Sequence, residues 1–309
     1  MEDDADWDVT FKDRLSDFAA GSRYFHSKAS DQPPRSPYGD TWDMLWLGHC
    51  SLEEHTKLPR PHERFLIEND PSVPRPNRRM NFARVPDMSE YSNTTRVVFP
   101  TNFGICLYSY ALSYSGAQKV LRAQAVRKKW AHIDLAMGHM CNSTSNDFKC
   151  IGVFPQIVDT HKAAGSWDRD SNIGVFSHDT VREHAYTANI IQSTRVNIDH
   201  LLAGKETVRQ WTEDGPPQTW EGGVRTRVVE APPPKKGANK AEFVTPTDDA
   251  RAEAPPPFED ANTAKVSPPT DDSRAGAPRP NEDADKADLI TPTDESGAGA
   301  ANGNSHAET

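Results

Sequence analysis

The chain has 309 residues and a formal net charge of −10 at neutral pH. This acidic balance argues against nucleic acid as a partner, because phosphate binding needs clustered Lys and Arg, and the basic run Arg127–Lys129 is typical of a helix C-terminus. No apolar run approaches the ~20 residues that a membrane-spanning helix needs, so we expect no membrane span in this chain.

The chain begins with an acidic run, Glu2–Asp8. Such a run normally lies at the carboxyl end of a buried parallel strand, where open α/β sheets bind their ligands. Its carboxylates suit Mn²⁺ or Mg²⁺, because hard cations prefer oxygen ligands. Asp4 is the best candidate ligand, with Asp3 beside it on the metal or on a ribose. We expect Asp6 and Asp8 to be surface or helix-capping acids, and the alternative for the whole run is a solvated terminus.

The sequence pattern of the first half of the chain predicts few helices and strands. Apolar residues on one helical face predict a helix from Val9 to about Ala20, and a short buried strand follows at Met44–Leu47. Residues 51–96 hold many Pro and charged residues with little periodicity, so we expect a long loop with short extended pieces. A weak alternation predicts a strand over Ile105–Leu112.

The second half is expected to alternate helices and strands. Ser113 should cap a helix, and a shorter helix over Asp134–Met140 should begin with its aspartate as the N-cap. Strands are expected at Cys150–Phe154 and Ile157–Thr160, and a last helix over Ile190–Leu202. This alternation favours an α/β architecture.

Composition changes near Gly204. Beyond about residue 215, large apolar residues nearly vanish, and Pro, Ala, Asp, Glu, Thr and Gly dominate. Such a segment cannot bury enough apolar surface to offset an ordering entropy of roughly 1–2 kcal/mol per residue. We therefore expect a folded domain over residues 1–204 and a disordered acidic tail over residues 205–309.

The four cysteines are Cys50, Cys106, Cys141 and Cys150. They permit three pairings, of which Cys141 with Cys150 is the easiest to close across a short loop. A zinc site built with His139, Cys141 and Cys150 is the alternative. It lacks a clear fourth ligand and a Cys-x-x-Cys pair, which makes it the weaker interpretation.

Motifs of hydrolases, kinases and metalloproteases are absent from the sequence, which weakens those classes. Instead, several segments follow the acidic run in a fixed order: Trp42–Cys50, Ile67–Pro71, Ser109–Leu121, Ile133–Ala136, Phe154–Gln156, His161, Gly165 and Asp170–Ile173. In order and spacing this series resembles glycosyltransferase family 25, in particular its fungal members. That family includes bacterial lipooligosaccharide galactosyltransferases and eukaryotic collagen galactosyltransferases. The resemblance covers roughly residues 1–204 and lacks the N-terminal half of the nucleotide-binding sheet.

The resemblance implies a nucleotide-diphospho-sugar transferase (GT-A-like) fold, of which this chain holds the C-terminal part. It implies transfer of a sugar, galactose first, from a UDP-sugar to a hydroxyl of a glycan or protein acceptor, with inversion. Asp4, with Asp3 and His161, would hold Mn²⁺ (or Mg²⁺) on the donor diphosphate. Asp134 would act as the base that takes the proton of the acceptor hydroxyl.

Each of these roles has a plainer alternative. Asp134 could serve only as an N-cap, and His161 could be an ordinary surface histidine. Trp167 and Tyr114 could stack on a sugar, although such side chains more often pack in a core or rim.

Because the strands that hold uracil and ribose are missing, we expect the chain alone to be poorly stable and inactive in sugar transfer. A different class stays open, a non-catalytic remnant that acts as an interaction protein. Two sequons, Asn93-Thr94-Thr95 and Asn142-Ser143-Thr144, suit a secretory lumen. If an N-terminal anchor is missing from the chain, the endoplasmic reticulum or Golgi lumen is expected, and otherwise the cytoplasm.

Overall fold

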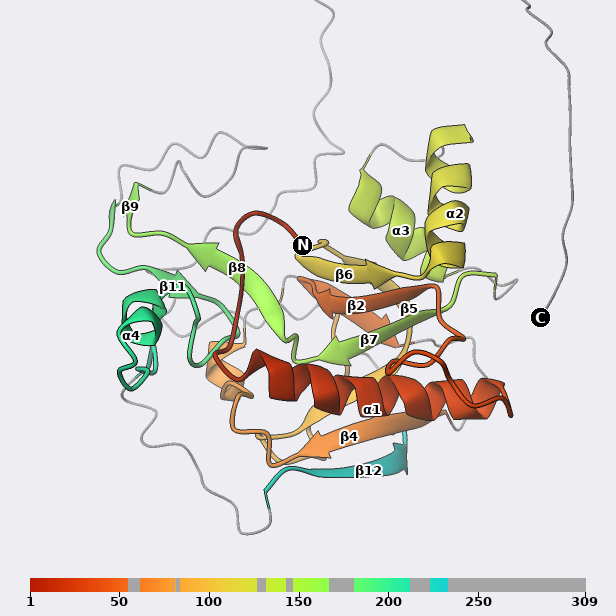
Figure 1. The fold of residues 1–309 in the computed structure, drawn as a ribbon, viewed down its shortest axis with the longest axis horizontal. Helices are drawn as coiled ribbons and strands as arrows, with labels where there is room; N and C mark the ends of the chain where they lie inside the picture. Colours follow the sequence, from red (N-terminus) through yellow and green to blue (C-terminus); the bar gives the residue numbers. More distant parts are fainter. Residues whose placement is uncertain are drawn as a thin grey trace, which may run out of the picture. The chain divides into compact units, whose positions relative to one another are not determined.

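The computed structural model describes residues 1–54, 62–79, 81, 84–126, 132–142, 147–166, 181–211 and 223–232. All of them belong to the first of two units, Met1–Pro257. They form a mixed α/β fold with a larger and a smaller sheet (Figure 1). The expected α/β class is therefore confirmed. Residues 233–309, Trp167 and the motif at residues 170–173 lie outside the described residues.

The larger sheet has the strand order β12-β4-β5-β7-β2-β6, and β3 pairs with β5 off this path. Its strands are β2 (Met44–Gly48), β3 (Ser51–Glu54), β4 (Glu63–Glu68), β5 (Arg96–Ile105), β6 (Ser109–Leu112), β7 (Cys150–Phe154) and β12 (Arg225–Glu230). Strands β2 and β7 run parallel, whereas the other described pairs of this sheet are antiparallel. The sheet is therefore mixed.

Strand β2 is buried along its whole length, as its apolar sequence predicts. Met44 and Trp46 belong to one buried cluster, and Leu45 and Leu47 belong to another. This alternation follows from the two-residue period of a strand, and it means that both faces of the sheet are covered. Helix α1 (Phe11–Ala29) covers the leucine face, and α3 (Ile133–Cys141) contributes to the cluster on the other face.

The helices agree with the sequence in part. Helix α1 is longer than expected, whereas α2 (Tyr114–Leu121) begins as predicted, because the Ser113 Oγ accepts a hydrogen bond from the Gly116 N–H at 3.0 Å. The predicted helix over residues 190–202 is wrong for its first half, since α4 covers only Ile198–Leu202.

Residues 51–96 are not the long loop that their composition predicts. They contain β3, β4 and the 3₁₀ turn η1 (Pro76–Arg78). The charged residues of β4 gave the sequence no strand pattern. In the structure, Arg64 is 1% exposed and donates two hydrogen bonds of 2.6 Å to the carboxylate of Glu54 on β3. This bidentate pair neutralises a charge that would otherwise exclude the segment from the core.

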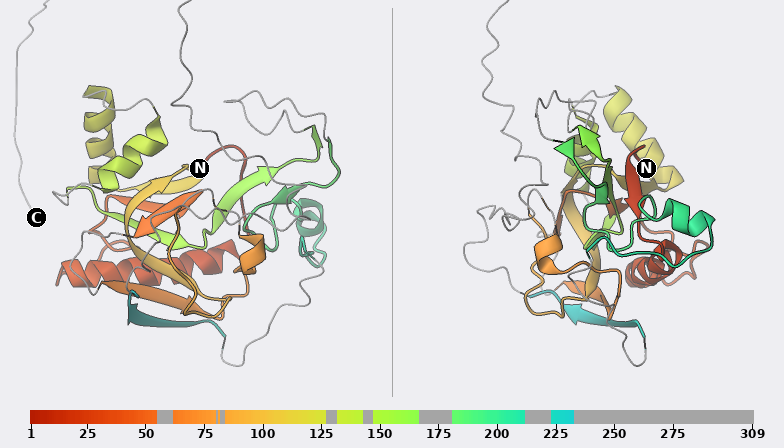
Figure 2. Two further views of the ribbon diagram at one scale, coloured as in Figure 1. Left: turned by 180° about the vertical axis from the view of Figure 1, so that it is seen from behind. Right: turned by 90° about the vertical axis from the view of Figure 1, so that its left-hand side faces the viewer.

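Strand β12 lies inside the segment predicted to be a disordered tail. It pairs antiparallel with β4, and Figure 2 shows it at the edge of the sheet. Four of its six residues are charged or polar and five are exposed, as is common in edge strands, so the segment carries little apolar signal in the sequence. The boundary expected at Gly204 is therefore not the end of the fold.

The smaller sheet has the order β1-β8-β11 and is antiparallel. It consists of β1 (Ala5–Trp7), β8 (Val158–Lys162) and β11 (Tyr186–Thr187), and a separate pair joins β9 (Gly165–Ser166) to β10 (Val181–Arg182). Among the described residues, no helix is both long and apolar enough to cross a membrane.

Two disulfides join the four cysteines. The predicted Cys141–Cys150 bond is confirmed, and Cys50 pairs with Cys106. The alternative zinc site is therefore wrong, because both of its thiols are in a disulfide.

A buried ion-pair network connects α1 to the sheet. The Asp70 carboxylate accepts hydrogen bonds from Arg14 at 2.7 Å and from Arg96 at 2.8 Å. Burial opposes the ionisation of Asp70, but the positive charges of Arg96 and Arg14 outweigh it and lower its pKa. Arg96 also donates to the Gln156 carbonyl at 2.8 Å, so the network holds the segment that leads into β8.

Candidate functional site

The smaller sheet brings Asp4 and His161 together. The His161 N–H donates to the Asp4 carbonyl at 2.8 Å, next to the β1–β8 pair Ala5↔Thr160. On the other side of β8, Thr187 is the register partner of His161. Residues opposite one another on antiparallel strands project to the same face, so Asp4, His161 and Thr187 form one row across three chain segments.

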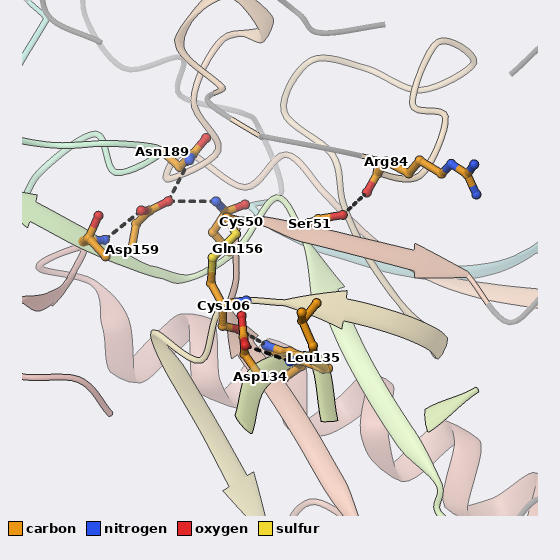
Figure 3. Close-up of a disulfide and its surroundings, with 11 residues drawn as sticks. Cys50, Ser51, Arg84, Cys106, Asp134, Leu135, Gln156, Asp159 and Asn189 are labelled. Carbon is orange, nitrogen blue, oxygen red and sulfur yellow. Dashed lines mark hydrogen bonds between the residues drawn. A yellow bond between two sulfur atoms is a disulfide. The ribbon is translucent and has the colours of Figure 1, made fainter. Parts of the chain in front are cut away.

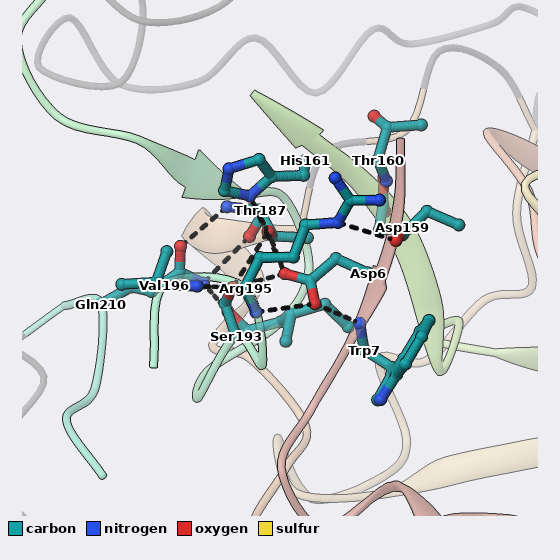
Figure 4. Close-up of polar contacts among 12 residues, drawn as sticks. Asp6, Trp7, Asp159, Thr160, His161, Thr187, Ser193, Arg195, Val196 and Gln210 are labelled. Carbon is teal, nitrogen blue, oxygen red and sulfur yellow. Dashed lines mark hydrogen bonds and ion pairs between the residues drawn. The ribbon is translucent and has the colours of Figure 1, made fainter. Parts of the chain in front are cut away.

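The imidazole of His161 is held through its Nδ1 atom. This atom lies 3.0 Å from the Thr187 Oγ1, which in turn donates to the Asp6 carboxylate at 2.5 Å (Figure 4). Because the single hydroxyl proton of Thr187 is directed to Asp6, we assign the Nδ1 of His161 as the donor to Thr187. The lone pair of Nε2 is then available to an external group.

Burial lowers the pKa of His161, although the nearby charge of Asp6 opposes this shift. Its imidazole is therefore neutral at pH 7. A neutral imidazole with Nε2 unprotonated is the form that binds a metal ion.

Asp6 and Asp8 are buried, and the N-cap of α1 is Thr10, so the expectation that they are surface or helix-capping acids is wrong. Asp6 accepts hydrogen bonds from the Thr187 and Ser193 hydroxyls and from the Arg195 N–H at 3.2 Å. Asp8 accepts from the Thr10 and Gln192 N–H groups at 3.0 and 2.9 Å. Asp4, Asp6 and Asp8 alternate with a period of two, and this spacing is a signal of a strand that the sequence already contained.

The Asp4 carboxylate is half-buried, and the Lys162 Nζ lies 4.0 Å from it as a weak ionic contact. Burial raises the pKa of Asp4, and Lys162 lowers it in part. Asp3 beside it is exposed. Asp4 is therefore a carboxylate that a cation would stabilise in its ionised form.

Asp134 lies in the first turn of α3, beside the Cys50–Cys106 disulfide (Figure 3). His132 is the N-cap, so the expectation that Asp134 takes this position is wrong. Its carboxylate accepts the Leu135 N–H at 2.8 Å and the Cys106 N–H at 3.2 Å. These two bonds orient the carboxylate while leaving further lone pairs for a ligand.

Glu2 connects the two predicted parts of the site. Partial burial raises its pKa, and the neighbouring charges of Asp4 and Asp134 raise it further. The carboxylates expected at the metal and at the base therefore lie close enough to affect a common neighbour.

Tyr108 is a residue that the sequence analysis missed. Its carbonyl accepts the Glu2 N–H at 3.0 Å. Burial raises the pKa of its phenol far above the usual value, and four carboxylates raise it further: Asp159, Glu2, Asp4 and Asp134. The Tyr108 hydroxyl therefore stays protonated at neutral pH. Its only sequence signal is its position directly before the motif Ser109–Leu121.

Asp159 is a further buried carboxylate on β8. It accepts hydrogen bonds from Asn189 at 2.6 Å, Gln156 at 2.7 Å and the Thr160 N–H at 2.7 Å (Figure 3). Burial raises its pKa to about 7 despite these donors.

Within the part of the chain that the structure describes, no three His, Cys, Asp or Glu side chains are grouped so that they could hold a metal ion. A cation at Asp4 and His161 would have these two protein ligands. Cations such as Mg²⁺ often bind to one or two protein groups and take their other ligands from substrate phosphates and water. The donor set therefore fits a cation that arrives with a diphosphate better than a resident one.

Comparisons of this chain with family models, with curated proteins and with solved structures found no match.

Proposed function

We propose that the chain carries the catalytic side of a glycosyltransferase of the family 25, GT-A-like type. It would transfer a hexose, galactose first, from a UDP-sugar to an acceptor hydroxyl with inversion. The observation that carries the proposal is the His161 imidazole, whose Nδ1 is held through Thr187 by Asp6 and whose Nε2 faces the same side of the sheet as Asp4. Histidines that bind metals commonly have such a carboxylate behind the other ring nitrogen.

Asp4 and His161 would hold Mn²⁺ (or Mg²⁺), and Asp3 would lie beside the ribose of the donor. When bound, the cation supplies positive charge that neutralises the leaving diphosphate. The lowered pKa of His161 favours this role. Because the imidazole is already neutral, it does not have to release a proton before the cation binds.

Asp134 would take the proton of the acceptor hydroxyl. The two N–H bonds from Leu135 and Cys106 hold its carboxylate in one orientation, which a base in an inverting transfer needs. Tyr108 would contribute a hydroxyl donor that never ionises at working pH, and which therefore favours oxygen acceptors on a substrate.

The test measures binding of Mn²⁺ by electron paramagnetic resonance, with and without UDP, for the chain and for Asp4→Asn and His161→Gln. We expect each substitution to weaken UDP-dependent Mn²⁺ binding by about 10-fold or more, because each removes one of two ligands. The matched control is Asp13→Asn, which changes an exposed carboxylate on α1. Unchanged binding in Asp4→Asn would contradict the metal site.

The base is tested separately. In a form of the protein that transfers sugar, Asp134→Asn should leave the binding of Mn²⁺ and UDP intact and lower the rate of transfer by roughly 10²–10⁴-fold. A variant that transfers galactose at the rate of the parent chain would show that Asp134 serves only to hold the Cys106 turn.

A further inference from the structure

Thr95 carries a buried hydroxyl. It is the first residue before β5 and is 0% exposed. Its Oγ1 finds no hydrogen-bond partner among the described residues. Burying an unpaired hydroxyl destabilises a fold, and Val has nearly the same shape without that penalty. The described part of the fold therefore gives no reason for a threonine at this position.

Asn93 lies two residues before Thr95, in the sequon Asn93-Thr94-Thr95. Its side chain is exposed, while its backbone is held in place, since the Asn93 carbonyl accepts a hydrogen bond from Arg79 at 2.8 Å. The Thr95 N–H also donates to the Ser92 carbonyl at 2.9 Å. A group attached to Asn93 would therefore project from a fixed turn into solvent.

The cysteines point to the compartment in which such a group is attached. All four are joined in disulfides, Cys50–Cys106 and Cys141–Cys150. Disulfides form and persist in oxidising compartments and are rare in the cytosol. This observation is independent of the sequon and of the unpaired hydroxyl.

We propose that Asn93 is an N-glycosylation site and that the protein folds in an oxidising secretory lumen. The glycosylating enzyme then recognises the Thr95 hydroxyl on the unfolded chain, before folding buries it. In the reaction, the Asn93 Nδ2 bonds to the anomeric carbon of a lipid-diphosphate-linked oligosaccharide. The anomeric C–O bond breaks, the lipid diphosphate leaves, and the amide loses one proton.

The second sequon does not carry the same argument. Asn142 is half-buried, and the residues that follow it, 143 and 144, lie outside the described part of the chain. The proposal is therefore confined to Asn93.

The decisive measurement is made on the protein isolated from the cells that produce it. Treatment with peptide N-glycosidase converts a glycosylated asparagine to aspartate, which mass spectrometry detects at position 93. We expect this conversion together with intact disulfides in the untreated protein. An unmodified Asn93 in that protein would overturn the proposal.

Variants expressed through a eukaryotic secretory pathway test the role of the hydroxyl. Asn93→Gln and Thr95→Val should lose the glycan at this site, whereas Thr95→Ser should keep it. Thr95→Val made without glycosylation in bacteria under oxidative refolding should match the parent's Tm or exceed it by about 2–4 °C. A large drop in its Tm, with Asn93→Gln unaffected, would show that the hydroxyl serves the fold and would remove the main support for the proposal.

Discussion

Asp70 and Asp159 are buried carboxylates, 0% and 3% exposed, whose pKa values shift in opposite directions. Asp70 lies between two arginines, and their charges lower its pKa. Asp159 receives hydrogen bonds from the amides of Gln156 and Asn189 and from a backbone N–H, and its pKa rises to about 7. Two carboxylates that are almost equally buried can therefore have pKa values that shift in opposite directions.

The charge of the partner decides the direction. A cation stabilises the ionised carboxylate by more than burial destabilises it, whereas neutral donors do not compensate fully for the lost hydration. The two networks are also connected, because Arg96 donates to Asp70 and to the Gln156 carbonyl, while the Gln156 side chain donates to Asp159. Asp70 is therefore ionised at neutral pH, whereas Asp159 can gain or lose a proton near neutral pH.

The largest effect should come from Asp70→Asn. This change leaves Arg14 and Arg96 buried without their carboxylate, and breaking a buried ion pair in this way costs about 3–5 kcal/mol. We expect the free energy of unfolding in urea to fall by that amount at pH 7. Asp13→Asn on the surface of α1 is the control and should change it by less than about 0.5 kcal/mol. A loss of the same small size for Asp70→Asn would mean that the network adds no stability.

The second prediction concerns the pH dependence of stability. Asp159 binds a proton in the folded state up to about pH 7, whereas the unfolded chain releases it near the ordinary value of 3.8. Between these pH values the folded state binds more protons, so stability should fall as the pH rises through this window. The loss attributable to Asp159 is on the order of 4 kcal/mol for about three pKa units.

Asp159→Asn should remove this loss. The Oε1 of Gln156 is buried without a hydrogen-bond partner, so an amide at position 159 has an acceptor available after rotation of the Gln156 side chain. Urea unfolding from pH 4.5 to 8 should therefore be flatter for the variant than for the parent. Equal slopes would contradict a raised pKa at Asp159.

Asp70 should act in the opposite sense at low pH. Its lowered pKa means that it contributes stability above the ordinary carboxyl range, and this stability is lost as the pH falls through its folded-state pKa. We expect Asp70→Asn to abolish part of the acid unfolding transition below about pH 4. An unchanged acid transition would indicate that other carboxylates dominate it.

The smallest expected effect is that of Thr187→Val on the candidate metal site. The variant loses the group that holds the His161 Nδ1, and loss of such a supporting contact weakens metal binding by about 10–100-fold. Ser193→Ala is the comparison variant, because Ser193 donates to the same Asp6 carboxylate and accepts a longer bond of 3.2 Å from Thr187, whereas the His161 Nδ1 bonds to Thr187. If both variants weaken UDP-dependent Mn²⁺ binding equally, Asp6 acts through general packing and not through the orientation of His161.

Local sequence patterns determined a definite part of this protein. The apolar run at Met44–Leu47 predicts the buried strand β2, Ser113 predicts the start of α2, and the short separation of Cys141 and Cys150 predicts their disulfide. Each depends on neighbours along the chain, so its physical cause is contained in a short window of sequence.

Only the tertiary structure decided which charged residues are buried and with which partners. Asp6 is buried because hydroxyls of Thr187 and Ser193, more than 180 residues away, satisfy it, and β4 is a core strand because Glu54 neutralises Arg64. The approach of Tyr108 to four carboxylates has the same origin. A charge enters a core when a distant group pairs with it, and no local window of the sequence contains that partner.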